Sequence, residues 1–150
     1  MLHSAIRKVF GKTIIRRRLP NDLGGRIIFT SPAVALGWLK PDVRRVDPFL
    51  CRITPSVVSK DDIVWDIGAN VGLFTLIASS IAGPQGSVLA LEPDPWLCEL
   101  FRKSMRLSRQ GNAAISLIQA CISNSLGLKT LYFAGNSRAA NFIEGQTGSS

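Results

Sequence analysis

The chain has 150 residues, of which 46% are hydrophobic and 19% are charged, and its mean hydropathy is +0.21. This composition is typical of a folded globular protein and excludes a disordered chain, while the length fits one domain with a substantial core. Every apolar run is far shorter than the roughly 20 residues that span a bilayer, so the sequence predicts no transmembrane helix.

The net charge of +8 is concentrated in the first part of the chain. Residues 1–60 contain 12 Lys and Arg against 3 acidic residues, a balance of +9, whereas residues 61–150 contain 6 against 7, a balance of −1. Apolar residues at helical spacing in MLHSAIRKVFGKTIIRRRLP predict a basic amphipathic helix that ends at Pro20. We interpret its basic face as solvated. Peripheral contact with an anionic membrane, nucleic-acid binding and a transit peptide are the alternatives.

The cysteine and histidine content argues against metal and disulfide chemistry. Cys51, Cys98 and Cys121 are widely spaced and odd in number, which is typical of reduced thiols in the cytoplasm. No CxxC occurs, and His3 is the single histidine, so neither a zinc site nor a Ser-His-Asp triad is expected. Cys98 and Cys121 are interpreted as small apolar residues and not as nucleophiles.

Residues 1–60 are expected to form a helical and extended lead-in that packs on a main unit, residues 61–150. The stretch RIIFT, residues 26–30, predicts a short strand, and four prolines then interrupt the chain up to residue 60. A short helix within DPFLCRITPSVVS is expected to break at Pro55.

From residue 61 onward, apolar runs alternate with helical patterns. The expected elements are a strand over 62–66, a helix after the loop at 68–72, a strand over 87–93, a helix over 94–111 and a strand over 114–123. Along these strands, apolar and polar residues do not alternate. Such apolar strands predict a parallel sheet that is covered on both faces, and Trp65 is expected in the core. The predicted fold class is α/β, Rossmann-like and doubly wound.

Three parallel strands are fewer than a complete doubly wound domain contains, so the fold is expected to be incomplete on its C-terminal side. The stretch LKTLYFAG predicts one arm of a hairpin, and no strand or helix is expected in the last ten residues, NFIEGQTGSS.

The stretch VWDIGANVG, residues 64–72, predicts a ligand site where the first strand of the sheet ends. Gly68 and Gly72 let the backbone turn sharply and approach a ligand, and the following helix N-terminus attracts an anion. Glu92 ends the next strand 20 residues after Gly72, the position of an acid that binds a ribose diol. Asp66 precedes the loop and would repel a pyrophosphate but attract an amine.

These features favour S-adenosylmethionine over a dinucleotide or a nucleoside triphosphate. The loop lacks the second and third glycines of G-x-G-x-x-G and the lysine of a P-loop. An adenosine that carries an amino acid would place its amine at Asp66, its carboxylate at the helix N-terminus and its ribose at Glu92.

VWDIGANVGLFTLIAS, followed by VLALEPDP and QACISNSLGLKTLYF, resembles the FkbM-type class I S-adenosylmethionine-dependent methyltransferases over about residues 45–143. The resemblance implies that Asp66, Gly68, Ala69, Asn70 and Gly72 line the methionine end of the cofactor. Glu92 would hold the ribose, and Pro93 and the region of Cys121 would lie near the adenine. Asn70 could bind the methionine carboxylate or brace the loop.

The resemblance implies methyl transfer to a hydroxyl group of a small molecule or glycan. The acidic motif that members of the family carry on a fourth strand has no counterpart in these residues, so no catalytic base is named. A cofactor-binding domain without turnover and a nucleic-acid methyltransferase stay as alternatives. The basic lead-in would serve the latter, although it is remote from the loop and no N-P-P-[YFW] signature occurs.

Overall fold

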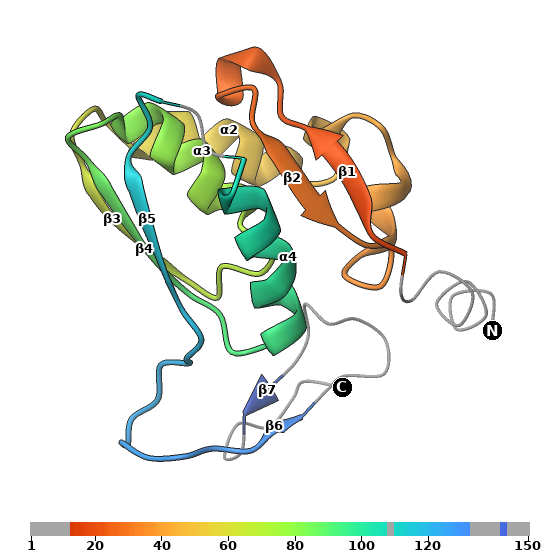
Figure 1. The fold of residues 1–150 in the computed structure, drawn as a ribbon, viewed down its shortest axis with the longest axis vertical. Coiled ribbons are helices and arrows are strands. Elements are labelled where there is room, and N and C mark those ends of the chain that lie inside the picture. The colour runs from red at the N-terminus through yellow and green to blue at the C-terminus, as the bar shows by residue number, and fades with distance from the viewer. Residues whose placement is uncertain (1–12, 108–109, 133–141, 144–150) are drawn as a thin grey trace.

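A computed structural model describes residues 13–107, 110–132 and 142–143 of the chain (Figure 1). In chain order its strands and longer helices are β1 (Ile15–Arg18), β2 (Ile27–Thr30), α2 (Pro48–Val57), β3 (Ile63–Ile67), α3 (Leu73–Ala82), β4 (Ser87–Leu91), α4 (Pro95–Met105), β5 (Ala114–Ile118), β6 (Leu131–Tyr132) and β7 (Phe142–Ile143). Three short 3-10 helices lie in the lead-in: η1 (Asn21–Leu23), η2 (Leu36–Leu39) and η3 (Val43–Arg45).

The main sheet is three-stranded and parallel, in the order β3-β4-β5. Asp66 of β3 pairs with Ala90 of β4, and Ala90 pairs with Leu117 of β5, so the three strands end at one edge. Each crossover between strands carries a helix, α3 and then α4. The predicted α/β, Rossmann-like fold is confirmed by this pairing.

The elements of the main unit match their sequence signals closely, with shorter ends. Asp94 caps α4 by accepting from the amides of Trp96 and Leu97, and Pro95 takes the first helical position. The helix ends at Met105 and does not reach Gly111, and β5 ends at Ile118 and not at residue 123.

The lead-in differs from its prediction. Residues 15–18 form β1, which pairs antiparallel with β2, so this part of the expected amphipathic helix is a strand. The helix α2 runs through Pro55 to Val57 and does not break there. The helically spaced apolar positions on which the prediction rested, Leu2, Ile6, Val9 and Phe10, lie outside the described residues.

One hydrophobic core joins the lead-in to the main unit. Ile28 of β2 and Trp38 of η2 belong to the same buried cluster as Leu76 of α3 and Phe101 of α4. The strand β2 packs on α4, and α2 packs on α3. Residues before Lys60 therefore complete the core that α3 and α4 begin, since each of those helices needs a covering layer on its outer side.

One face of the parallel sheet is bare among the described residues. Ile63, Trp65 and Ile67 alternate along β3 and are 77%, 65% and 58% exposed. Figure 1 shows α2, α3 and α4 together on the other side of the sheet. The prediction of cover on both faces is therefore wrong for this part of the chain, and so is the placement of Trp65 in the core.

Within the predicted hairpin arm, Leu131–Tyr132 form β6, which pairs antiparallel with β7 and not with β5. The strand β7 lies within the last ten residues, where no element was expected. A search of the described residues finds no helix that is long and apolar enough to span a membrane.

Candidate functional site

A cavity of about 560 Å³ lies where β3 ends and the glycine loop begins. One wall consists of the end of β3, the loop and the start of α3, and it includes Asp66, Gly68, Ala69 and Asn70. The opposite wall, which we call the lead-in wall, consists of Val34, Ala35, Trp38, Val46, Asp47 and Leu50. The volume is in the range of small-molecule sites, so the loop is one side of a cavity large enough for a ligand.

Asp66 is the acid of the loop-side wall, and Thr75 of α3 holds it in place. The Thr75 hydroxyl donates a short hydrogen bond to Oδ2 of Asp66. Burial raises the pKa of the Asp66 carboxyl above its ordinary value, and the Thr75 hydrogen bond opposes this rise. Among the described residues no Lys or Arg forms an ion pair with Asp66, so its charge lacks a compensating cation.

The loop amides donate within the protein, at the positions of Gly68, Ala69, Asn70, Val71 and Gly72. Asn70 has a positive φ of 55°, and its Oδ1 accepts from the Val71 amide at 2.7 Å. Of the two expected roles for Asn70, bracing the loop is therefore the one observed. The helix α3 begins at Leu73, directly after the loop, and its first amides precede the internal hydrogen bond from Leu76 to Gly72.

The two loop glycines serve different purposes. Both have positive φ, 81° at Gly68 and 87° at Gly72. A Cβ at Gly68 would meet no protein atom within 4 Å, whereas a Cβ at Gly72 would lie 2.4 Å from the ring of Phe101. Gly68 thus leaves open space beside the cavity, and Gly72 permits close packing between the start of α3 and α4.

Glu92 ties the loop to the next strand–helix turn. Its Oε2 accepts from the Asn70 amide at 2.8 Å, and its Oε1 accepts from the Asp94 amide at 2.9 Å. The residue is only 6% exposed, and burial raises the pKa of its carboxyl. Each oxygen keeps a second lone pair, so ribose binding by Glu92 stays a prediction beside this structural role.

Four of the eight predicted cofactor residues do not line the cavity. They are Gly72, Glu92, Pro93 and Cys121. Cys121 follows the end of β5 and is partly exposed. Cys98, by contrast, is fully buried on α4, and burial raises the pKa of its thiol to about 11, which fits the expected packing role.

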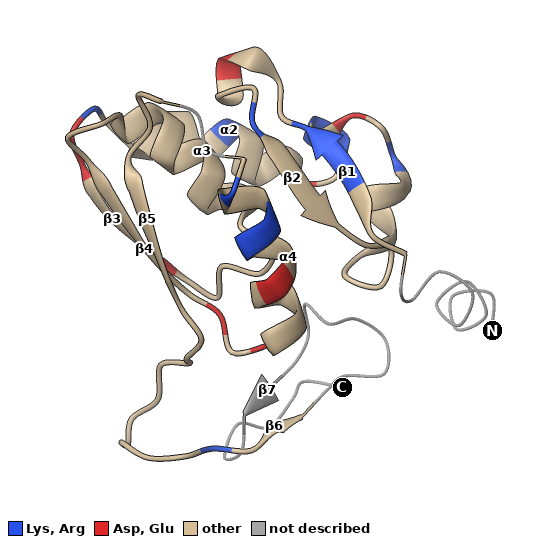
Figure 2. Ribbon diagram, in the orientation of Figure 1, with Lys and Arg blue, Asp and Glu red and all other residues tan. Residues whose placement is uncertain are grey.

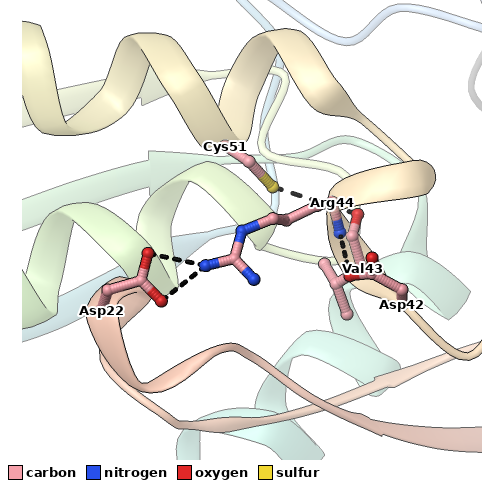
Figure 3. Close-up of polar contacts among 5 residues, drawn as sticks. All are labelled: Asp22, Asp42, Val43, Arg44 and Cys51. Carbon is pink, nitrogen blue, oxygen red and sulfur yellow. Dashed lines mark hydrogen bonds and ion pairs between the residues drawn. The ribbon is translucent and has the colours of Figure 1, made fainter.

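Ionic and polar contacts within the first 45 residues hold the lead-in wall. Figure 3 shows the guanidinium of Arg44 on both carboxylate oxygens of Asp22, at 2.6 and 2.7 Å. The guanidinium of Arg17 donates to the backbone oxygens of Trp38 and Lys40 at 3.0 and 3.1 Å. These cations are thus used beside the wall and do not line the cavity.

Sequence reasoning missed Thr75 and the lead-in wall. A signal for Thr75 exists, because it is the polar residue in the otherwise apolar first turn of α3, directly after the loop. The lead-in wall carries no comparable signal, since its residues are scattered between prolines.

Basic and acidic residues lie on different parts of the molecule. Figure 2 shows basic residues on β1 and acidic residues where β4 leads into α4. Glu92 and Asp94 belong to the latter group, and Asp66 lies on the adjacent strand. No cluster of three or more His, Cys, Asp or Glu that could hold a metal occurs in the described part of the chain.

No protein-family model matches the chain, and no curated protein matches it either. Among solved structures, fibrillarin from Aeropyrum pernix, solved with natively bound S-adenosyl-L-methionine, is 25% identical with a TM-score of 0.36. The match covers 43% of this chain and 26% of the fibrillarin chain. The FkbM-type resemblance stays a prediction.

Proposed function

We propose that the chain binds S-adenosylmethionine at the glycine loop and belongs to a methyltransferase that acts on a hydroxyl of a small molecule or glycan. The observation that carries the proposal is that Asp66 and Gly68 line the same cavity. A partly buried carboxylate with no Lys or Arg ion pair in the described part of the chain lies beside a glycine with open space, in a cavity of about 560 Å³. A ligand with a positive charge would compensate Asp66.

The residues fit the methionine end of the cofactor better than a pyrophosphate. A pyrophosphate would be repelled by Asp66 and would find the loop amides occupied by Leu91, Glu92 and other internal acceptors. An amino acid offers an amine to Asp66, and its carboxylate can reach the amides at the start of α3, near Leu73.

When bound, the cofactor would supply an electrophilic methyl group on a positively charged sulfur. Asp66 would hold the amine, Thr75 would keep the Asp66 carboxylate oriented, and Gly68 would let the ligand approach the backbone. Asn70 and Glu92 would keep the loop in its conformation before the ligand arrives, which lowers the cost of ordering on binding. The acceptor hydroxyl must meet the methyl group in line with the sulfur.

Calorimetric titration of the 150-residue chain with S-adenosylmethionine tests the proposal. We expect saturable binding by the wild type, and Asp66→Asn should weaken it at least about tenfold because the charge partner of the amine is lost. Asp61→Asn is the matched control, since Asp61 is exposed and outside the cavity. Its affinity should stay within about twofold of the wild type.

Two alternatives give different results. Absence of S-adenosylmethionine binding, or equal binding by the Asp66→Asn variant, would contradict the proposal. Binding without transfer of a labelled methyl group to any hydroxyl acceptor would favour a cofactor-binding domain without turnover. Affinity for RNA that falls steeply with salt would favour a nucleic-acid substrate.

A further inference from the structure

We infer that the lead-in wall is the acceptor side of the site and selects an apolar alcohol or phenol that carries no negative charge. This inference rests on the proposed function and adds the substrate class. The observation behind it is the composition of the cavity, whose two walls come from separate segments of the chain, one ending at Leu50 and the other beginning at Trp65.

Apart from Asp47, the lead-in wall is apolar, and part of it belongs to the main core. Val34 and Trp38 are 2% and 3% exposed and belong to the main core, so they cannot move away without disturbing it. Leu50 and Val46 pack against the same core from α2 and the turn before it. A ligand that fills this part of the cavity must therefore offer apolar surface, worth about 25 cal/mol per Å² removed from water.

The charged side chains of the cavity are both acidic. Asp47 lines the lead-in wall and Asp66 the loop-side wall, and no Lys, Arg or His is among the lining residues. The nearby guanidinium groups are held elsewhere, that of Arg44 on Asp22 and that of Arg17 on backbone oxygens. With Asp66 paired to the cofactor amine, a phosphate, sulfate or carboxylate on the acceptor would meet the like charge of Asp47 and no Lys, Arg or His side chain of the lining.

One carboxylate oxygen of Asp47 can accept a hydrogen bond from a substrate hydroxyl. Its Oδ1 caps α2 by accepting from the Leu50 amide at 2.9 Å. Its Oδ2 has no hydrogen-bond donor among the described residues. An acceptor hydroxyl can donate to Oδ2 while its carbon skeleton lies on Val46 and Leu50, which would orient its oxygen. Asp47 is thus a positioning residue that contacts the substrate.

Two probes of one shape test the charge preference, namely 2-naphthol and 2-naphthalenesulfonate. Each is titrated into the 150-residue chain saturated with S-adenosylhomocysteine, which prevents turnover. We expect 2-naphthol to bind at least about tenfold more tightly than the sulfonate, because the sulfonate faces the carboxylate of Asp47.

Variants at the lead-in wall test where 2-naphthol binds. Asp47→Asn keeps the cap of α2, because Asn is also a good N-cap residue, and should reduce the preference for 2-naphthol at least about threefold. Asp42→Asn is its control, since Asp42 caps η3 in the same way but lies outside the cavity. Leu50→Gln should lower the affinity for 2-naphthol. Phe49→Gln, at an exposed neighbouring position outside the cavity, should leave this affinity unchanged.

The outcomes separate this inference from the proposed function. If S-adenosylhomocysteine itself does not bind, the proposed function fails. If it binds but the sulfonate binds as well as 2-naphthol, or neither probe binds, the acceptor class is wrong. If Asp47→Asn and Asp42→Asn behave alike, Asp47 does not contact the acceptor and its assigned role is wrong.

Discussion

The Glu92 carboxylate accepts the backbone amide of Asn70 at 2.8 Å, so the acid at the end of β4 holds the glycine loop that follows β3. Its other oxygen accepts the amide of Asp94 at 2.9 Å. Both donors are backbone amides of the chain itself. Glu92 therefore has a structural role that can be separated from the ribose-binding role that its position in the sequence predicts.

Glu92→Gln should destabilise the protein without ligand. A glutamine side chain can accept only one of the two amides, and leaving the other buried amide unpaired costs about 1–3 kcal/mol. Urea unfolding measures this change in the free energy of unfolding. Glu99→Gln on α4 is the control, because the pair of Glu99 with Lys103 is exposed and should contribute less than about 1 kcal/mol. An unchanged or increased stability of Glu92→Gln would show that the burial of its charge outweighs its hydrogen bonds.

Asp66→Asn should affect stability and binding in opposite directions. Because the folded-state pKa of Asp66 is raised, its contribution to stability is fully present below the unfolded pKa, near 4, and is lost as pH rises through the folded pKa. Asparagine carries no charge to bury and can still accept from Thr75. The variant should therefore unfold at higher urea than the wild type at pH 7, and the difference should vanish toward pH 3.

The same raised pKa predicts a pH dependence of ligand binding. A cationic amine needs Asp66 ionised, so the affinity of the wild type for S-adenosylmethionine should fall as pH drops through the raised pKa. Thr75→Val removes the hydrogen bond that opposes the rise and should shift this loss to higher pH, whereas Thr75→Ser should not. A pH-independent affinity between pH 4 and 7 would exclude Asp66 as the partner of the amine.

Alanine substitutions at the two loop glycines should separate packing from binding. Gly72→Ala should cost about 2–4 kcal/mol, because the new Cβ would lie 2.4 Å from the ring of Phe101 and φ is positive. Gly68→Ala should cost about 1–2 kcal/mol from its positive φ alone, yet it should abolish cofactor binding.

A double-mutant cycle tests whether the contact with Phe101 causes the cost of Gly72→Ala. Adding Phe101→Leu to Gly72→Ala should recover part of the lost stability, which gives a coupling energy above about 0.5 kcal/mol. Additive effects of the two substitutions would mean that the helices adjust and the contact does not decide the cost.

Arg26→Met should be neutral or stabilising. Arg26 is 2% exposed, its Nη1 donates to Ser79 at 3.0 Å, and its Nε and Nη2 have no hydrogen-bond partner among the described residues. Burial lowers the pKa of Arg26 to about 10. Replacing a poorly compensated buried charge with an apolar side chain often raises stability by about 1–4 kcal/mol. Arg16→Met, at an exposed position of β1, is the control, and a loss above about 1 kcal/mol specific to Arg26→Met would contradict the prediction.

Local signals were sufficient for the elements of the main unit. The apolar runs of β3, β4 and β5, the cap at Asp94 and the positive-φ stop at Gly83 all act within a few residues. Element order then predicts a parallel sheet, because helical crossovers return each strand in the same direction. The sequence also predicted that the loop and Glu92 lie together, since both follow the ends of adjacent strands.

Contacts between distant residues were decided only by the tertiary structure. The charge run at Arg16 to Arg18 belongs to a strand because pairing with β2 overrides its helical preference. Trp65 is exposed because α2, α3 and α4 all lie on the other face of the sheet. Trp38 and Asp47 join the cavity only because the lead-in packs beside the end of β3 and the loop, and no local pattern in the sequence predicts such a contact.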